Sequence, residues 1–342
     1  MRLVVVGATG AVGTEMLKIL EERDFGAHEV IPVASPRSAG RKLDFAGRAI
    51  EVRALAADVF EGADLALFDV PDELSEQWAP IAAAAGAIVV DNSAAWRMHE
   101  QVPLVVPEVN PEDALLRPLG IIASPNCTTL AMVVPLGALH AEVPLTRLIV
   151  ASYQAASGVG KPGVDELWDQ TERVVKEPDL AREGLARDAI EGAAVFRHPL
   201  AMNVIPQAGS FADGGYTSEE LKLCYESRKI LGTPDLPVTG TCVRVPVAVG
   251  HGVSVHAEFE RPITPQRARA ILLAAPGVEL HDDPESYSYP TPLQAAGRDP
   301  CYVGRIRQDL FDDKALEMFC VADNLRKGAA LNTVQIAELL QH

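Results

Sequence analysis

The first third of the chain alternates short apolar runs with segments of helical periodicity. Runs rich in β-branched residues predict strands at residues 3–6, 30–34, 65–68, 87–91 and 119–123. Apolar positions recur at helical spacing over residues 11–22, and residues 80–85 predict a second helix with Pro80 in its first turn. Strands joined by helices at this spacing indicate βαβ units and a parallel sheet.

The pattern changes after about residue 145. Strands are predicted at 148–153 and 241–249, and helices at 163–175 and 328–340. Residues 176–200 and 279–300 are rich in charge, Pro or Gly, which is typical of loops. This mixed order predicts an α+β domain beside the first, and a length of 342 residues also favours two domains.

Charge and composition exclude several protein classes. Asp and Glu exceed Lys and Arg by 47 to 30, whereas a nucleic-acid-binding protein needs a basic surplus. The longest apolar region, 119–141, is interrupted by two prolines and falls short of the roughly 20 residues of a membrane span. Five scattered cysteines form no CxxC pair, and no HExxH motif is present. We therefore expect a cytoplasmic protein that binds no metal, no membrane and no nucleic acid.

A glycine-rich loop directly follows the first predicted strand and opens the first helix. Such a loop permits a tight turn and lets a pyrophosphate approach the helix N-terminus, where free N–H groups favour anions. The alternative is a plain tight turn. The expected cofactor-binding residues of this loop are Gly7, Thr9, Gly10, Ala11, Val12 and Gly13.

The end of the second strand distinguishes between the two nicotinamide cofactors. NAD-binding chains usually place an acidic residue there for the ribose 2′-hydroxyl. Here Ser35, Arg37 and Ser38 follow the strand, with no acid and with further cations at Arg41 and Lys42. This favours the 2′-phosphate of NADP, although a solvated basic loop would show the same composition.

Cys127 stands between the last predicted strand of this region and an apolar helical run. A cysteine at a helix start lies at the positive end of the helix dipole, which favours the thiolate. Most lone cysteines are structural. The dinucleotide loop upstream makes a catalytic nucleophile the stronger interpretation.

Eight separate segments, in order, resemble the aspartate-semialdehyde dehydrogenase family over nearly the whole chain. They are GATGAVG at 7–13, DNSAAWR at 91–97, VPLVVPEVN at 102–110, SPNCTT at 124–129, YQAASGVG at 153–160, EELKLCYESRKILG at 219–232, TCVRVPVAVGH at 241–251 and DNLRKGAALNTVQIAE at 323–338. The resemblance implies a Rossmann-type dinucleotide-binding domain, residues 1–130 with the C-terminal helix 324–342. Residues 131–323 would form an α+β catalytic and dimerisation domain, in a homodimer or a dimer of dimers.

The resemblance also implies an activity: NADPH-dependent reduction of aspartyl phosphate to aspartate 4-semialdehyde, on the route to lysine, threonine and methionine. Cys127 would form a thioester, His251 would act as acid and base because imidazole titrates near neutral pH, and Gln154 would position the intermediate. The implied substrate-binding residues are Arg244, Glu219, Lys222, Arg97 and Asn126, and the implied further cofactor-binding residues are Ser157, Gly158 and Asn324.

Simpler roles remain open for several of these residues. Arg244 lies in an apolar strand, where it needs a partner, and that partner is a substrate carboxylate or a structural salt bridge. Glu219 and Lys222, three apart on a helix, could form an ordinary ion pair. Gln154 could be a strand-end residue satisfied by backbone.

The chain departs from the family pattern at three places: the turn at 68–75, the residue after the catalytic histidine, and the positions Ser93-Ala94 and Ser124. A Ser/Ala/Gly-rich turn beside the cofactor is replaced by the acidic stretch 68–75, and the serine after the catalytic histidine is Gly252. Two alternatives therefore stay open: a paralogue acting on another acyl phosphate, such as the N-acetylglutamyl-phosphate type, and a noncatalytic paralogue. The set of Glu219, Lys222 and Arg244 disfavours the first, because a substrate amino group explains the glutamate.

Overall fold

The protein divides into two compact units. A computed structural model describes residues 1–184 and 194–341. The first unit comprises Met1–Leu130, Arg228–Pro234 and Leu325–His342, and the second comprises Ala131–Ser227 and Asp235–Asn324. The first therefore includes a short segment, Arg228–Pro234, that the predicted first domain lacks.

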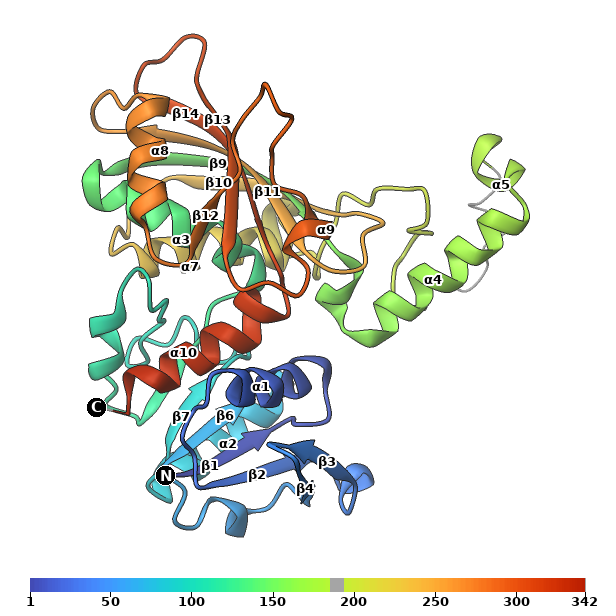
Figure 1. The fold of residues 1–342 in the computed structure, drawn as a ribbon, viewed down its shortest axis with the longest axis vertical. Coiled ribbons are helices and arrows are strands. Elements are labelled where there is room, and N and C mark those ends of the chain that lie inside the picture. Colours follow the sequence, from blue (N-terminus) through green and yellow to red (C-terminus); the bar gives the residue numbers. More distant parts are fainter. Residues whose placement is uncertain (185–193, 342) are drawn as a thin grey trace. The chain divides into compact units, whose positions relative to one another are not determined.

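The first unit is built on a six-stranded parallel sheet of order β5-β2-β1-β6-β7-β8 (Figure 1). The strands are β1 (Arg2–Val6), β2 (Glu29–Ala34), β5 (Arg53–Ala54), β6 (Leu65–Phe68), β7 (Ile88–Asp91) and β8 (Ile121–Ala123). All five predicted strands of this region are confirmed. A hairpin of β3 (Lys42–Phe45) and β4 (Arg48–Glu51), which the sequence analysis missed, follows β2.

Helices cover both faces of this sheet. Leu3, Val5 and Leu67 pack with α1 (Ala11–Glu22) and α10 (Leu331–Leu339) in one core cluster. Phe68 points to the opposite face, because side chains alternate along a strand, and it stacks on Phe60. Phe60 in turn contacts Trp78 of α2 (Asp72–Ala84).

Two helix boundaries in the first unit differ from the prediction. Pro80 lies inside α2, not in its first turn, because the helix begins eight residues earlier, after Pro71 and with two acidic residues in its first turn. The C-terminal helix α10 begins at Leu331 and is preceded by a π-helix, Arg326–Ala330. Residue 342, the last of the chain, lies outside the described residues.

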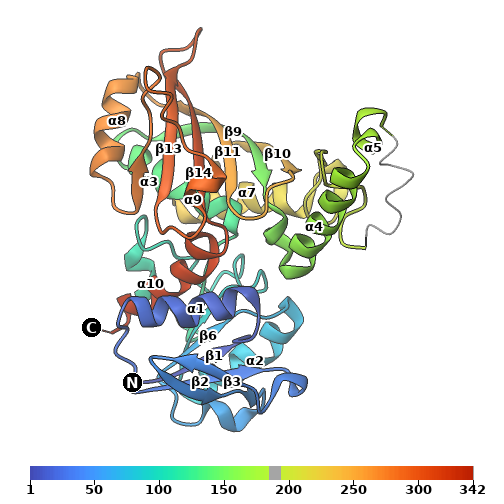
Figure 2. The same ribbon diagram turned by 45° about the vertical axis from the view of Figure 1, so that its right-hand side comes forward.

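The second unit contains a mixed six-stranded sheet of order β10-β9-β11-β14-β13-β12 (Figure 2). Its strands are β9 (Leu145–Gln154), β10 (Val238–Arg244), β11 (His251–Phe259), β12 (Val278–Leu280), β13 (Cys301–Gln308) and β14 (Ala315–Ala322). Along β11 buried and partly exposed positions alternate, so one face of the sheet is covered and the other open.

The predicted strand at 241–249 is right only to Arg244. Pro246 has no N–H to continue the ladder, and Gly250, at φ 96°, turns the chain into β11. β10 pairs with one edge of β9 in parallel, and β11 pairs with the other edge in antiparallel orientation. The residues at the ends of β10 and at the start of β11 therefore lie on either side of the end of β9.

The described chain contains six further α-helices besides short 3₁₀ helices, and none of its helices is long and apolar enough to span a membrane. They are α3 (Cys127–Glu142), α4 (Lys161–Lys176), α5 (Asp179–Arg182), α7 (Ser218–Ile230), α8 (Pro265–Ala274) and α9 (Pro292–Ala295). The predicted loops at 176–200 and 279–300 thus contain the short helices α5 and α9, while residues 185–193 lie outside the described residues.

Candidate active site

The glycine-rich loop follows β1 in a geometry that only glycine fits. Gly7 has φ 91°, and a Cβ on it would lie 2.0 Å from the carbonyl oxygen of Asp69. A Cβ on Gly13 would lie 2.2 Å from the carbonyl oxygen of Gly7. Gly10 is the N-cap of α1, and no described side chain caps that helix. The first-turn amides of Ala11, Val12 and Gly13 can therefore receive a pyrophosphate.

The basic segment lies after β2, next to β1 in the sheet. Ser35 occupies the N-cap position of the 3₁₀ turn Pro36–Ser38 without a side-chain capping hydrogen bond, and Arg37 is exposed within the turn. β1 and β2 are parallel, so their carboxyl ends lie side by side. An exposed guanidinium at this edge of a dinucleotide-binding sheet is in the right place for a ribose 2′-phosphate.

Cys127 is the first residue of α3 and is half-buried. The side chain of Asn126 caps this helix: its Oδ1 accepts the N–H of Thr128 at 2.9 Å and of Thr129 at 3.4 Å. Asn126 thus fixes the helix start that carries the thiol. Its contact with substrate stays a prediction of the resemblance.

Arg97 is buried and ties two loops of the first unit together. Its Nε donates to the carbonyl of Ser124 at 2.9 Å, and its Nη2 donates to the carbonyl of Asn92 at 2.7 Å. Ser124 lies three residues before Cys127. The guanidinium therefore sits at the carboxyl edge of the sheet beside the segment that leads to the nucleophile.

The acidic stretch 68–75 is built into the same edge. Asp69 Oδ1 accepts from Asn92 Nδ2 at 3.0 Å, and Asp72 Oδ1 accepts the N–H of Ala94 at 2.8 Å. Ser75 Oγ donates to Asp91 at 2.9 Å. Burial raises the pKa of Asp69, against the hydrogen bond from Asn92. In this chain the departure from the family turn thus anchors the loop that leads to Arg97.

In the second unit, Arg244 and His251 converge on Gly158. A Cβ on Gly158 would lie 2.6 Å from Arg244 Nη1 and 3.3 Å from His251 Nε2. Arg244 is paired in register with Gln154 across β10 and β9, and its Nη1 also donates to the carbonyl of Ala155 at 2.6 Å. The side chains of Gln154, Arg244 and His251 are almost fully buried.

His251 is held as a neutral ring with a defined tautomer. Its Nδ1 accepts the N–H of Ala155 at 3.0 Å, which leaves the proton on Nε2. Among the described residues Nε2 has no hydrogen-bond partner. Burial, and then the charge of Arg244, lower the pKa of His251 to about 3. The sequence analysis expected this imidazole to titrate near neutral pH, whereas burial and Arg244 shift its pKa downward in the free protein.

This depressed pKa gives a prediction for stability against pH. The unfolded ring binds a proton below about pH 6.5 and the folded ring only near 3, so unfolding takes up a proton in that window. The contribution of the neutral His251 ring to the free energy of unfolding is complete above pH 6.5. Below that pH it falls by about 1.4 kcal/mol per pH unit. In urea unfolding between pH 7 and 4, the free energy of unfolding of His251→Gln should fall less steeply with decreasing pH than that of wild type.

The exposed His198 provides the control for this measurement. His198→Gln should follow the wild-type profile. If the difference in free energy of unfolding between wild type and His251→Gln does not change with pH, the His251 ring of the folded protein takes up its proton as readily as the unfolded ring does.

Glu219 and Lys222 form an ion pair on α7. Lys222 Nζ lies 2.7 Å from Glu219 Oε1, with the two side chains 30% and 13% exposed. The other carboxylate oxygen, Oε2, accepts from Gln154 Nε2 at 3.4 Å. The pair is therefore not merely a solvated helix surface, because its carboxylate reaches the buried amide at the end of β9.

Two predicted cofactor-contact residues of the second unit meet directly. Ser157 Oγ donates to Asn324 Oδ1 at 3.0 Å, and the same oxygen accepts the N–H of Gly250 at 2.9 Å. Both side chains are buried. Asn324 thus holds the residue before His251, which is a positioning role that the sequence did not indicate.

Side-chain packing explains why residue 252 is a glycine. A Cβ at this position would lie 2.7 Å from Cζ of Phe319, whose ring also packs against Tyr153. Gly252 and His251 point to opposite faces of the sheet. The missing hydroxyl is therefore replaced by an aromatic ring on the face away from the histidine.

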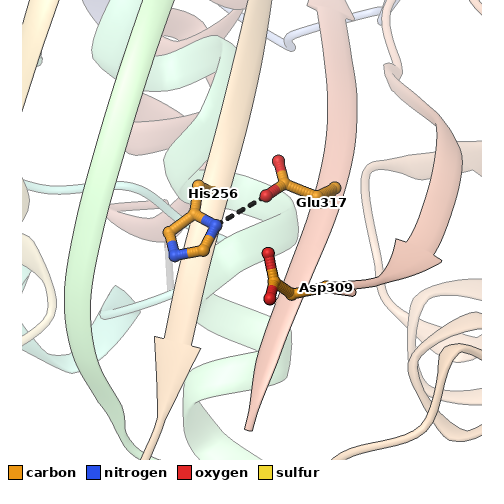
Figure 3. Close-up of side chains that lie close together, drawn as sticks. All are labelled: His256, Asp309 and Glu317. Carbon is orange, nitrogen blue, oxygen red and sulfur yellow. Dashed lines mark hydrogen bonds and ion pairs between the residues drawn. The ribbon is translucent and has the colours of Figure 1, made fainter. Parts of the chain in front are cut away.

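Figure 3 shows one group in the described chain whose atoms are close enough to hold a metal: His256, Asp309 and Glu317. His256 Nδ1 lies 2.6 Å from Glu317 Oε1, and Nε2 lies 3.5 Å from Glu258. Partial burial lowers the pKa of His256, but the hydrogen bonds and charges of Glu317 and Glu258 outweigh it and raise that pKa. Both ring nitrogens of His256 lie within ion-pair distance of a carboxylate oxygen, so we interpret the group as an ion-pair cluster.

The structure therefore brings the candidate residues together in two sets. In the first unit they follow the carboxyl ends of β1, β2, β7 and β8, which lie at one edge of the parallel sheet. In the second unit they surround the end of β9. Asp69, Ser75 and Asn92 are additional residues of the first set. In the sequence the departure at 68–75 marked the first two, and Asn92 lies in the segment DNSAAWR at 91–97.

Comparisons with known proteins identify the family of this chain. Residues 2–116 match the family described as "Semialdehyde dehydrogenase, NAD binding domain", and residues 136–327 match "Semialdehyde dehydrogenase, dimerisation domain". An aspartate-semialdehyde dehydrogenase of Streptomyces akiyoshiensis is 52% identical, covering 99% of this chain and 98% of its own. The chain belongs to the aspartate-semialdehyde dehydrogenase family.

Solved structures of the family extend the comparison. Aspartate semialdehyde dehydrogenase II from Vibrio cholerae, solved in complex with ASA, has a TM-score of 0.92 at 41% identity and covers 99% of this chain and 97% of its own. The enzyme from Candida albicans, solved with NADP, has a TM-score of 0.74 at 25% identity, covering 99% and 98%. The first unit thus carries a nicotinamide-dinucleotide-binding domain of a known kind.

Proposed function

We propose that this protein is a phosphorylating aspartate-semialdehyde dehydrogenase that reduces L-aspartyl 4-phosphate to L-aspartate 4-semialdehyde. The observation that carries the proposal is the paired set at the end of β9, where Arg244, His251 and Gln154 are buried together beside Glu219. A buried guanidinium and a carboxylate suit the α-carboxylate and amino group of an amino acid. A noncatalytic descendant has no physical need to keep these groups buried beside one another.

In the proposed reaction the Cys127 thiolate attacks the acyl phosphate, forms a thioester and releases phosphate. When bound, the nicotinamide supplies a hydride to the thioester carbon. Collapse of the resulting adduct expels the Cys127 thiolate and frees the aldehyde. Asn126 maintains the helix start at which the thiolate forms, and Arg97 binds the departing phosphate.

His251 acts first as a hydrogen-bond donor. In the proposed reaction its Nε2–H donates to the substrate oxygen on which charge develops, while Nδ1 is fixed by the Ala155 amide. The charge of Arg244 helps to lower the His251 pKa. A substrate carboxylate bound to Arg244 would neutralise that charge and raise the pKa, so the ring would become a better base only when substrate is present.

NADP is the cofactor we propose. The residues of the first unit fit it: a glycine cradle that a Cβ would fill, an open helix N-terminus, and the exposed Arg37 after β2 where NAD-binding chains carry an acid. The proposed assembly is a homodimer formed through the second unit. Its open sheet face exposes Ile149 and Tyr153 at 40% each, which suits contact with a second copy. A dimer of dimers stays a prediction.

The first experiment is phosphate-dependent reduction of NADP, in parallel with NAD, by purified protein given aspartate semialdehyde. We expect turnover that requires phosphate and prefers NADP. A folded protein that binds NADP without turnover would point to another carbonyl substrate, tested with N-acetylglutamate semialdehyde. Failure to bind either cofactor would favour the noncatalytic alternative.

Arg244→Lys should chiefly raise the semialdehyde KM. The change keeps the charge but removes the planar fork that can hold a carboxylate while Nη1 binds the Ala155 carbonyl. Loss of one charge-assisted hydrogen bond, about 1.5–3 kcal/mol, corresponds to roughly a 10- to 100-fold rise. The exposed Arg173→Lys serves as control. An unchanged KM would assign Arg244 to a structural salt bridge.

A further inference from the structure

One lysine outside the residues assigned above binds three backbone carbonyls at once. Lys229, in the last turn of α7, donates from Nζ to the carbonyls of Arg97 at 2.7 Å, His99 at 2.9 Å and Val102 at 2.8 Å. All four residues belong to the first unit. An ammonium has three N–H donors, as many as the carbonyls that Lys229 binds here.

The segment that Lys229 binds contains no helix or strand. From Asn92 to Val102 the backbone runs through bends and turns, in which the carbonyls of Ala94, Trp96 and His99 accept backbone N–H groups. The first half of this segment is held by Asp72, through the N–H of Ala94, and by Ser75, through the indole N–H of Trp96. Lys229 holds the second half, beginning at Arg97 itself.

We propose that Lys229 is the positioning residue for Arg97 and thereby determines how well the enzyme binds phosphate. Arg97 has its guanidinium anchored at Ser124 and Asn92, and Lys229 anchors its backbone, so both ends of the residue are fixed. Each bond of the ammonium is charge-assisted and stronger than a neutral one. This inference rests on the proposed function, in which Arg97 binds the phosphate.

A purely structural role for Lys229 makes a different prediction from a positioning role. Loss of a structural contact would lower stability and reduce kcat for every substrate alike. Loss of positioning would move the guanidinium relative to the phosphate and raise the KM for phosphate selectively. A misplacement of about 1 Å costs on the order of 10²-fold in related situations.

The test uses the full-length protein and the variant Lys229→Met, which keeps the length of the side chain and removes its donors. We expect the KM for phosphate to rise roughly 10- to 100-fold. The KM for aspartate semialdehyde and the affinity for NADP should stay unchanged. Amide hydrogen exchange of peptides covering 92–102 should accelerate, because the segment loses its anchor.

Two further variants make the outcome decisive. Lys18→Met removes a lysine that is 56% exposed on α1 of the same unit and should behave as wild type. Lys229→Arg keeps the charge and can reach only part of the three carbonyls, so it should give an intermediate phosphate KM. If Lys229→Met does not fold, the phosphate KM of Lys229→Arg tests the positioning role of Lys229.

The failure of this proposal can be told from the failure of the proposed function. Unchanged phosphate KM and unchanged exchange at 92–102 in Lys229→Met would overturn the role of Lys229. Wild-type protein that shows no phosphate-dependent turnover would overturn the function and with it the phosphate role of Lys229, while the exchange measurement still tests the anchor.

Discussion

Cys127→Ala is expected to abolish turnover, by at least about 10⁴-fold in kcat, because it removes the thiol that forms the thioester in the proposed reaction. NADP binding should persist, since the glycine loop and Arg37 are untouched. Steady-state kinetics and cofactor titration on the same preparation check both statements. The thiol is half-buried at a helix start, so its removal leaves no large cavity in the core.

The other cysteines provide the controls for this prediction. Cys224 on α7 is also half-buried, and Cys224→Ala should retain activity. Cys242, Cys301 and Cys320 are buried, and burial raises the pKa of the Cys320 thiol, which keeps it unreactive. Alkylation should therefore inactivate through Cys127, and substrate should protect it. Turnover by folded Cys127→Ala would refute the mechanism.

The first unit could be predicted well from the sequence because its strands are buried on both faces. Residues 65–68 read as an uninterrupted apolar run, and the strand has these bounds. The glycine loop and Cys127 are local features too, since each depends on residues adjacent in sequence. The predicted helix at 11–22 also matches, because its apolar spacing matches its buried face.

The second unit was harder because its strands are paired across long separations and alternate between a covered and an open face. β11 joins residues near 150 to residues near 320, and no local pattern reports such pairing. The site shows the same limit. The His251 pKa depends on burial and on Arg244, and the Lys229 contacts span 127 to 132 residues of chain. The sequence motifs predicted which side chains form the site, but not their burial or the neighbours that surround them.

A buried ionic network behind the nucleophile segment leads to the largest stability effect we expect. Lys327, 1% exposed, donates to Glu108 at 2.6 Å, to Gln335 at 2.7 Å and to Asn332 at 3.0 Å. Asn332 in turn donates to Ser124 Oγ at 2.9 Å. The network therefore reaches the loop three residues before Cys127, and it lies wholly within the first unit.

Lys327→Met should lower the free energy of unfolding by about 3–5 kcal/mol, because it leaves the Glu108 carboxylate buried without its cation. Chemical denaturation of the variant and of Lys18→Met, an exposed control expected within about 0.5 kcal/mol of wild type, measures this. Adding Glu108→Gln to Lys327→Met should recover part of the loss, since it removes the uncompensated charge and keeps the shape. If the double variant were less stable than Lys327→Met, the cost would instead come from the unmet oxygens of Asn332 and Gln335. In that case the lysine would matter as a hydrogen-bond donor more than as a counter-charge.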